Sequence, residues 1–250
     1  MELFLISINP IDVFLWTFRK NEKDVVNLYN TLSPVMQIAT GGSMLNFGYW
    51  SKENSDPISA QENLCNVFGN LSELSTAKNV LDVGSGLSAP SKLWRDSYPT
   101  LNLYDVNINF KQLSFLKHEK NIEFLNSTST KLPFANDSVD RVLALESAQH
   151  FKPLNNFISE SKRVLIKSGF LVMAVPITLK NSSLGKLGLL KFTWSSEHYG
   201  LDYLRDLISS NGFKIIDETL IGNHVYDPLA DYYVENRKLL SKKILKQYPG

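Results

Sequence analysis

Residues 80–88 combine an acid with two glycines in a spacing typical of a nucleotide-binding turn. The segment Val80-Leu81-Asp82-Val83-Gly84-Ser85-Gly86-Leu87-Ser88 is a short apolar run that carries one acid and ends in Gly-x-Gly. The first glycine permits a sharp turn out of a strand, and the second lets backbone approach a ligand closely. Asp105 closes a second apolar run, where a carboxylate can accept hydrogen bonds from ribose hydroxyl groups. These residues predict a nucleotide-type ligand at the carboxyl end of a parallel sheet.

The identity of that ligand stays open at this point. Gly84 to Ala89 also fits the Gly-x-Gly-x-x-Gly/Ala pattern of dinucleotide-binding folds. Asp82 argues against a nicotinamide or flavin, because it lies two residues before the first glycine, where a dinucleotide-binding strand usually stays apolar. A third interpretation is a strand-to-helix turn that uses glycine only for packing. The two carboxyl groups near strand ends disfavour it, since packing alone needs no charge there.

Composition indicates a globular α/β protein without a nucleic-acid partner. The 250 residues are 43% hydrophobic and 20% charged, with a formal net charge of +1. A cluster of lysines near the C-terminus is interpreted as a solvated helix face: Lys238, Lys242, Lys243 and Lys246. Cys65 is the single cysteine, which excludes an internal disulfide and favours a reducing compartment, so we expect a cytoplasmic protein. The four scattered histidines have no metal-ligand spacing.

The N-terminal residues are apolar but interrupted. Phe4–Ile8 and Ile11–Trp16 are separated by Asn9 and Pro10, so no run reaches the ~18 apolar residues of a membrane span. A signal peptide is not expected, because no basic region precedes the apolar part and no small-residue cleavage site follows it. We expect a helix that packs on the body or lines a substrate entrance. An interfacial membrane anchor is the alternative.

Strand-like and helix-like runs alternate from Asn79 onward, which favours a mostly parallel sheet flanked by helices. The expected strands are Asn79–Val83, Leu101–Asp105, Ile122–Leu125, Arg141–Leu145, Phe170–Val175 and Lys214–Leu220. The expected helices are Ala89–Asp96, Asn109–Glu119, Leu154–Ile166 and Glu197–Asn211. Gly169 and Gly212 are interpreted as helix C-terminal signals ahead of the last two strands. Residues 1–78 show helical patches without strand alternation, so we predict a helical cap over 1–78 and a sheet domain over 79–250.

Taken together, these features resemble the class I S-adenosylmethionine-dependent methyltransferases. Leu45-Asn46-Phe47-Gly48-Tyr49-Trp50 and Leu145-Glu146-Ser147-Ala148-Gln149-His150-Phe151 resemble segments of the small-molecule O-methyltransferases of natural-product pathways, of the erythromycin and rebeccamycin sugar type. The further matching segments are residues 80–86, Asp105, Leu132-Pro133-Phe134 and Asp140-Arg141-Val142. The resemblance implies a Rossmann-like fold with a seven-stranded, mostly parallel sheet, helices on both faces and an N-terminal helical cap. It also implies S-adenosylmethionine as the cofactor.

The resemblance further implies a set of cofactor-binding residues. Asp82 is expected to meet the amino end of the methionine part, Gly84 and Gly86 to pack along the cofactor, and Asp105 to bind the ribose. Thr128 and Ser129 are expected to lie against the adenine, and Asn46, Gly48 and Tyr49 to close the site over the methionine part. Two residues depart from the family pattern: Ser88 stands where a third glycine is common, and Thr128 where an acid is common.

His150 is the candidate general base, since histidine titrates near neutrality and can take a proton from a substrate hydroxyl as the methyl group arrives. A structural histidine at a helix start is the alternative. Glu146 follows the fourth expected strand, where ligands gather in such folds, and we expect it to belong to the catalytic and cofactor-binding residues, in a supporting role. His198 and Trp194 could contact substrate, although capping by Ser195 or Ser196 and packing are expected first. An aromatic cluster after the last expected strand is interpreted as a packing edge or a substrate-facing wall: Tyr226, Asp231, Tyr232 and Tyr233.

The sequence thus predicts methyl transfer from S-adenosylmethionine to a small, partly apolar acceptor, at oxygen. Methylation at nitrogen or carbon and a non-catalytic binding module remain open. A nicotinamide-dependent oxidoreductase is disfavoured by Asp82 and by the lack of a Tyr-x-x-x-Lys pair. A homo-oligomer is compatible with the chain, and stable membrane insertion is not expected.

Overall fold

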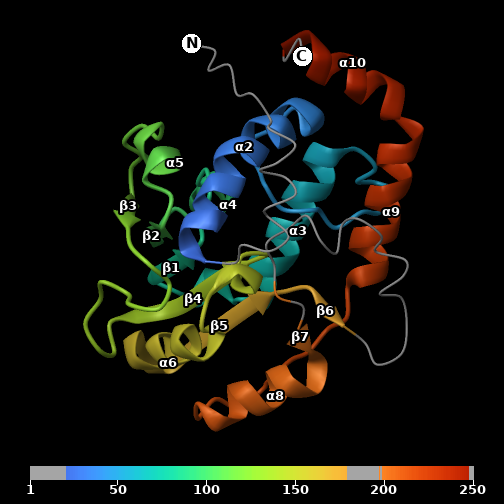
Figure 1. The fold of residues 1–250 in the computed structure, drawn as a ribbon. Coiled ribbons are helices and arrows are strands. Elements are labelled where there is room, and N and C mark those ends of the chain that lie inside the picture. Colours follow the sequence, from blue (N-terminus) through green and yellow to red (C-terminus); the bar gives the residue numbers. More distant parts are fainter. Residues whose placement is uncertain (1–20, 179–196, 198, 248–250) are drawn as a thin grey trace. The chain divides into compact units, whose positions relative to one another are not determined.

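The computed structural model describes residues 21–178, 197 and 199–247, and these divide into two compact units (Figure 1). The helical unit comprises residues 21–64 and 220–247, and the sheet unit comprises residues 65–178, 197 and 199–219. Within these residues no helix has the length and apolar character needed to cross a membrane. The domain boundary predicted after residue 78 stays a prediction. The N-terminal apolar segments, Trp194, Ser195, Ser196 and His198 lie outside the described residues.

The sheet unit is built on a parallel sheet that has five strands within the described residues, in the order β3-β2-β1-β4-β5. Their bounds are β1 Asn79–Val83, β2 Asn102–Asn107, β3 Ile122–Asn126, β4 Val139–Leu145 and β5 Leu165–Ala174. The chain builds outward from β1 through β2 to β3, and then returns to the other side of β1 with β4. This reversal creates a topological switch point between β1 and β4, where open α/β sheets bind ligands at the carboxyl ends of the strands.

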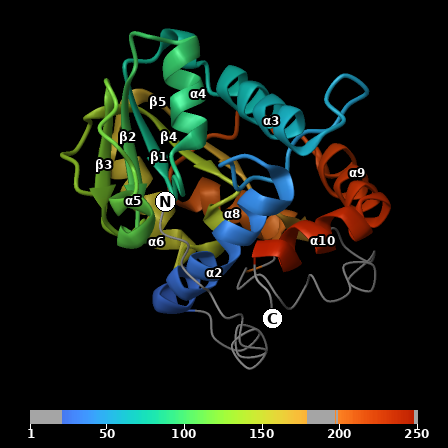
Figure 2. The same cartoon turned by 90° about the horizontal axis from the view of Figure 1, so that it is seen from above.

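Helices cover both faces of this sheet, as the sequence predicted. Figure 2 shows α4 (Ala89–Ser97) and α6 (Leu154–Val164) on opposite sides of the strands. The other helical segments of the sheet unit are η1 Leu74–Thr76, α5 Phe110–Ser114, η2 Ala148–His150 and α8 Leu201–Ser210. The apolar core lies where α6 packs on the strands, and it includes Leu81, Val142, Ala144, Phe157 and Ile158. Burial of these side chains supplies most of the driving force for forming the sheet.

The strand predicted at Lys214–Leu220 is wrong. These residues have no regular structure, and the side chain of Ile216 is 75% exposed. Alternation of apolar and polar residues predicts a strand only where a neighbouring strand takes up the backbone groups, and none does so here. Two short strands instead form a separate parallel pair, β6 Ile177–Thr178 and β7 Tyr199–Gly200. The count of seven strands in one sheet is therefore not confirmed within the described residues.

Three predicted helix limits also differ. Gly169 does not end a helix: α6 stops at Val164, β5 begins at Leu165, and Gly169 lies within β5 beside a register shift against β4. A Cβ on Gly169 would approach the Asp140 carbonyl oxygen to 2.9 Å, so the glycine serves close strand packing there. The helix expected at Asn109–Glu119 ends at Ser114, and the one expected from Glu197 begins at Leu201. Gly212 does follow a helix end, at φ +76.

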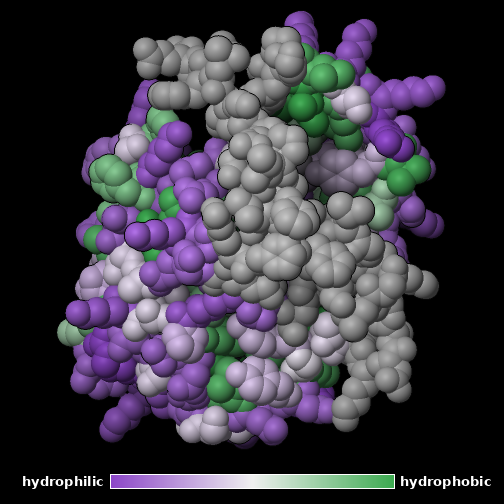
Figure 3. Space-filling model, viewed as in Figure 1, coloured by the Kyte–Doolittle hydropathy of each residue, from purple (hydrophilic) through white to green (hydrophobic). Residues whose placement is uncertain are grey.

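The helical unit contains α2 Glu22–Thr40, the first part of α3 Pro57–Leu71, α9 Gly222–Glu235 and α10 Arg237–Gln247. Residues 21–78 hold no strand, in agreement with the prediction. Asn21 and Asp24 form a capping box that fixes the start of α2. The side chains of Lys238, Lys242, Lys243 and Lys246 are exposed along α10, which confirms the predicted solvated face. Hydrophilic surface lies at the top right of Figure 3, where Figure 1 draws α10.

Candidate functional site

The glycine segment forms the expected sharp turn between β1 and α4. Gly84 and Gly86 have φ values of +80 and +57, which residues with a Cβ rarely adopt. The backbone N–H groups of Gly84 and Ser85 both donate to the carbonyl of Val106, at 2.7 and 3.3 Å, so the turn is fixed to β2. A Cβ on Gly84 would lie 2.5 Å from the Cβ of Ser147. The turn therefore packs against the residues that follow β4.

Ser88 ends this turn in an unusual conformation. It occupies the N-cap position of α4 with φ +61, and its side chain makes no capping hydrogen bond. The residue is fully buried; its hydroxyl forms no hydrogen bond of ordinary geometry within the described residues, but it lies close enough to Asp105 to lower the pKa of that carboxyl group. This agrees with the sequence comparison, in which Ser88 replaces a common glycine.

Asp82 and Asp105 lie side by side in neighbouring strands. They are partners in the parallel register of β1 and β2, and both are buried. The hydroxyl oxygen of Ser91, in α4, lies 2.6 Å from Asp105 Oδ1 and 3.3 Å from Asp82 Oδ2. Burial raises the pKa of Asp105 to about 6, and burial followed by the neighbouring Asp105 charge raises the pKa of Asp82 well above its ordinary value.

Asp105 is not the last residue of its strand, contrary to the prediction. β2 continues to Asn107, whose position is level with Gly84 when the register of the two strands is extended. The Asn107 side-chain amide donates to the carbonyl of Gly86 at 3.0 Å and to Gln112 Oε1 at 2.9 Å. Asn107 therefore borders the glycine turn, and Asp105 lies one layer deeper. The ribose-binding role predicted for Asp105 stays a prediction.

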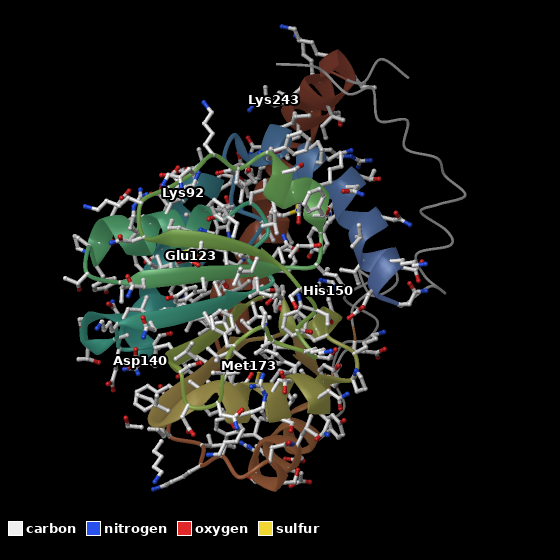
Figure 4. All side chains as sticks on the ribbon, turned by 90° about the vertical axis from the view of Figure 1, so that its left-hand side faces the viewer. Lys92, Glu123, Asp140, His150, Met173 and Lys243 are labelled. Carbon is white, nitrogen blue, oxygen red and sulfur yellow. The ribbon has the colours of Figure 1, made fainter. Side chains whose placement is uncertain are left out.

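Glu146 to His150 form a compact turn at the carboxyl end of β4. Glu146 has φ +50, and its backbone N–H donates to the carbonyl of Ala174. Ser147 Oγ donates to the carbonyl of Val83 at 2.7 Å, which ties this turn to the end of β1. His150 is buried in η2, and Figure 4 shows it at the opposite end of the sheet from Asp140, which lies near the start of β4. The turn thus brings Glu146 and His150 to the switch point.

Thr128 and Ser129 follow the end of β3 at the same edge of the sheet. Thr128 is half-buried, its hydroxyl lies 3.2 Å from that of Thr130, and its carbonyl accepts from the N–H of Lys131. Ser129 is buried. The predicted adenine-contacting residues therefore lie at the carboxyl end of the sheet, as the expected role requires.

Unpartnered buried polar atoms gather at this same edge. Four side-chain atoms of the sheet unit are buried without a hydrogen-bond partner within the described residues: Ser85 Oγ, Ser88 Oγ, Asp105 Oδ2 and Gln149 Oε1. All four follow or lie near the carboxyl ends of β1, β2 and β4. Buried polar groups are nearly always hydrogen-bonded, so such a concentration is typical of a site that receives a polar ligand. No group of three His, Cys, Asp or Glu side chains suited to a metal ion occurs in the described part of the chain.

Asn46, Gly48 and Tyr49 lie in the helical unit, where they hold one segment against α3. Asn46 Oδ1 accepts from the N–H of Gly48, and Gln61 Nε2 donates to the Asn46 carbonyl at 2.6 Å. Gly48 has φ +83, and a Cβ there would lie 2.8 Å from the Cβ of Ala60. These contacts explain the residue types by local structure alone. Their predicted role in closing a cofactor site stays a prediction.

The tyrosine-rich segment joins an aromatic cluster in this unit. The ring of Tyr49 stacks on His224 with the centroids 4.6 Å apart, and the rings of Trp50 and Tyr232 lie 5.4 Å apart. Phe47 and Tyr226 pair at 6.1 Å. Of the two interpretations of the tyrosine cluster, packing is thereby supported, and a role as a wall for substrate is a proposal.

Comparison with known proteins adds independent information. The family model described as a methyltransferase domain matches residues 81–173, which run from β1 into β5. The curated erythromycin 3''-O-methyltransferase of Saccharopolyspora erythraea is 24% identical over 254 aligned positions, covering 93% of this chain and 81% of that protein.

This chain contains a methyltransferase domain.

Two further comparisons agree with this assignment. The methyltransferase GfsG of Streptomyces halstedii is 29% identical over 139 residues, which cover 52% of this methyltransferase and 50% of that protein. The crystal structure of the 4+2 cyclase SpnF matches with a TM-score of 0.70 at 17% identity, over 92% of this methyltransferase and 88% of that chain. The latter likeness confirms the Rossmann-like fold. Both relatives are named as methyltransferases.

Two residues of the family-like segments serve the opposite end of the sheet in this methyltransferase. Asp140 Oδ2 accepts from the backbone N–H groups of Lys78 and Asn79, at 3.2 and 2.6 Å, at the start of β1. The buried guanidinium of Arg141 donates to the carbonyl of Ser72 at 2.6 Å and lies 4.4 Å from the ring centroid of Phe170. Both residues are structural.

The sequence did not indicate four residues at the site, the first of which is Asn107 at the end of β2. Ser91 bridges the two buried acids, Ser147 ties β4 to β1, and Gln149 Nε2 donates to the Glu146 carbonyl at 2.6 Å. Ser147 and Gln149 were inside the segment that resembles the family, so their position was available as a signal. Ser91 had none, because its role depends on which strands α4 packs against.

Proposed function

We propose that this methyltransferase transfers a methyl group from S-adenosylmethionine to a hydroxyl group of a small, partly apolar natural product. The observation that carries the proposal is the convergence of the glycine turn, the Glu146–His150 turn and four unpartnered buried polar atoms at the switch point between β1 and β4. Open α/β sheets bind nucleotide-like ligands at this position. The donor set of hydroxyl, carboxyl and amide groups fits a polar adenosyl ligand.

The cofactor contacts are proposed residue by residue. The backbone of Gly84 to Ser88 would pack along S-adenosylmethionine, with Asp82 below the turn facing the amino end of the methionine part, directly or through water. The ribose hydroxyls would be received at the end of β2, where Asp105 and Asn107 are the two candidates. Thr128 and Ser129 would contact the adenine, and Asn46, Gly48 and Tyr49 would close the methionine part.

The chemical step asks little of the protein beyond placement. S-Adenosylmethionine supplies an electrophilic methyl group on a sulfonium, and the acceptor oxygen displaces the thioether in line. The enzyme must hold the acceptor against the methyl group and exclude water. His150, at the end of β4, would accept the proton that the hydroxyl group loses. Glu146 would support this turn through its fixed backbone.

Two observations support oxygen as the acceptor atom and a partly apolar acceptor. The relative from Saccharopolyspora erythraea is named for O-methylation of erythromycin. The aromatic cluster that includes Phe47, Tyr49 and Tyr226 offers apolar and hydrogen-bonding groups of the kind that bind such products.

Two measurements test the proposal. Calorimetry of the purified chain with S-adenosylmethionine, S-adenosylhomocysteine and NAD(P)H should show binding of both adenosyl ligands. Binding of a nicotinamide with no adenosyl ligand bound at millimolar concentration would overturn the assignment. Transfer of label from methyl-labelled donor should then be screened over hydroxylated, amine and phenolic metabolites, with excess S-adenosylhomocysteine as the inhibited control. Labelling of hydroxylated acceptors alone supports O-methylation, and labelling of amines or carbon acceptors alone contradicts it.

A further inference from the structure

The two buried acids beneath the glycine turn cannot both be ordinary carboxylates. Asp82 and Asp105 are neighbours across β1 and β2, and their exposed fractions are only 2% and 0%. Two carboxylates this close repel each other, and burial removes the water that would screen them. The neighbours offer no compensating charge within the sheet, because Leu143 of β4 is the partner of Asp82 and Phe124 of β3 is the partner of Asp105.

The position of the Ser91 hydroxyl indicates how many protons the two carboxyl groups hold between them. Its hydroxyl group has one proton, yet its oxygen lies within hydrogen-bond distance of both acids. The 2.6 Å separation from Asp105 Oδ1 is that of a charge-assisted bond, in which Ser91 donates to an ionised carboxylate. The same hydroxyl proton cannot also be donated fully to Asp82 Oδ2 at 3.3 Å, so a proton held by Asp82 would complete this second contact.

The charged groups around the pair fit this assignment. Lys92 of α4 attracts the charge on Asp105 and lowers its pKa, although burial is the larger effect and raises it. Lys92 is itself paired with Glu119 at 3.2 Å, so it does not neutralise the pair fully. Lys92, which is also paired with Glu119, can stabilise one buried negative charge here, whereas a second buried charge would have no cation to offset its desolvation.

We propose that Asp82 and Asp105 share a single proton through Ser91, and that Asp105 is a positioning residue for the glycine turn rather than a ribose ligand. Ser91 lies in the first turn of α4, directly after Gly84 to Ser88, so the shared proton fastens that turn to β1 and β2. Loss of the proton places two like charges beneath the turn and loosens it. The ribose hydroxyls would then be bound at the end of β2, by Asn107.

The inference predicts how stability depends on pH, independently of any cofactor. In the folded chain Asp105 keeps a proton up to a pKa of about 6 and Asp82 keeps the shared proton to higher pH, whereas the unfolded chain loses both near the ordinary aspartate pKa. Stability therefore falls as pH rises above that ordinary value, first until Asp105 has lost its proton near pH 6 and further until the shared proton leaves Asp82. The folding equilibrium constant of the wild type should fall roughly tenfold between pH 5 and pH 6.5 beyond the fall seen in Asp105→Asn. Denaturant unfolding at each pH measures this, with exposed Asp206→Asn as the matched control that keeps the wild-type dependence.

Equal pH dependence in the wild type and Asp105→Asn would overturn the shared proton. If Asp105→Asn does not fold, carbon-13 NMR of aspartate carboxyl groups in the wild type answers the same question. One carboxyl group should still be protonated at pH 7, and titration of every aspartate below pH 5 would contradict the inference.

The positioning role is separable from ribose binding, and this part rests on the proposed function. Calorimetry should compare S-adenosylhomocysteine with its 2′-deoxy analogue in the wild type, Asp105→Asn and Asn107→Ala. The affinity ratio of the two ligands should be unchanged in Asp105→Asn and should approach one in Asn107→Ala. Loss of the ratio in Asp105→Asn would make Asp105 a ribose ligand. If neither ligand binds to the wild type, the proposed function fails while the unfolding result still decides the shared proton.

Discussion

Ser88 shows at the scale of one residue how the cofactor turn departs from its family. Its backbone lies at φ +61, and its buried hydroxyl makes no capping hydrogen bond and no hydrogen bond of ordinary geometry within the described residues, although it lowers the pKa of Asp105. Each of these features costs free energy that a glycine would avoid. Ser88 therefore makes the folded chain less stable than glycine would at this position.

Replacing Ser88 by glycine should raise the free energy of unfolding by about 1 kcal/mol. Relief of the backbone strain outweighs both the loss of the weak contact between the Ser88 hydroxyl and Asp105 and the extra freedom that glycine gives the unfolded chain. Denaturant unfolding measures the change. Ser88→Ala is the matched control, because it removes the hydroxyl but keeps the Cβ, so it should gain less. A less stable Ser88→Gly would show that the hydroxyl holds the turn.

His150 has two interpretations that a single substitution separates. If it accepts the substrate proton, His150→Ala should lower the rate of methyl transfer by about 100-fold or more. Affinity for S-adenosylhomocysteine, measured by calorimetry, should change far less, because the base acts on the acceptor. The exposed His118→Ala serves as control. An unchanged rate in His150→Ala would make His150 a structural residue.

At the scale of elements, the two ends of the sheet have divided tasks. The carboxyl ends of β1 and β4 carry the glycine turn and the Glu146–His150 turn, whereas the amino ends carry Asp140 and Arg141. Arg141 also donates to the carbonyl of Asp140 and to Thr76 Oγ1, so one side chain joins β4 to η1. Because these contacts hold the amino ends of the strands in place, the sheet does not depend on the residues at its carboxyl ends for its anchoring.

Arg141→Leu should therefore lower the free energy of unfolding by about 2–4 kcal/mol without touching the site. The substitution leaves the buried carbonyl of Ser72 without this partner and removes the partly buried bonds to the Glu73 carbonyl and Thr76 Oγ1. Thermal or denaturant unfolding gives the value. Arg205→Leu is the comparison, because Arg205 pairs with Glu218 at the surface and such a pair contributes less than about 1 kcal/mol. Equal losses in the two variants would contradict an anchoring role for Arg141.

The elements also show how far pattern alone reaches. β1 has the predicted limits, because an apolar run between a polar residue and a glycine turn leaves little choice. β2 runs two residues further, since Asn107 pairs with Asn126 of β3, a contact that the local sequence does not contain. The strand predicted at Lys214–Leu220 is wrong because no neighbouring strand pairs with these residues, which the local sequence also does not reveal.

At the scale of the molecule, the chain forms two compact units, each with its own buried tryptophan. In the helical unit, Trp50 donates to the carbonyl of Phe47, and its own backbone N–H donates to the carbonyl of His224. In the sheet unit, Trp94 donates to the carbonyl of Cys65 and stacks on Phe68. Residues far apart in sequence are joined in both cases.

We expect the two units to respond separately to loss of their tryptophans. Trp50→Ala should accelerate amide hydrogen exchange in α2 and α9, and Trp94→Ala in α4 and the strands, because each large cavity weakens the unit that contains it by about 3–5 kcal/mol. Hydrogen-exchange mass spectrometry resolves these segments. Equal acceleration in both units from either substitution would show a single cooperative structure instead.

The sequence by itself determined the class of the protein. The spacing of Asp82, Gly84 and Gly86, with the segments around Asn46 and His150, is local information, because a turn and the strand before it depend on adjacent residues. Only the tertiary structure decided which residues meet across elements. It paired Asp105 with Asp82 through Ser91, set Ser147 against Gly84, and moved the end of β2 to Asn107. Register and packing between distant segments fix such contacts, and no local pattern encodes them.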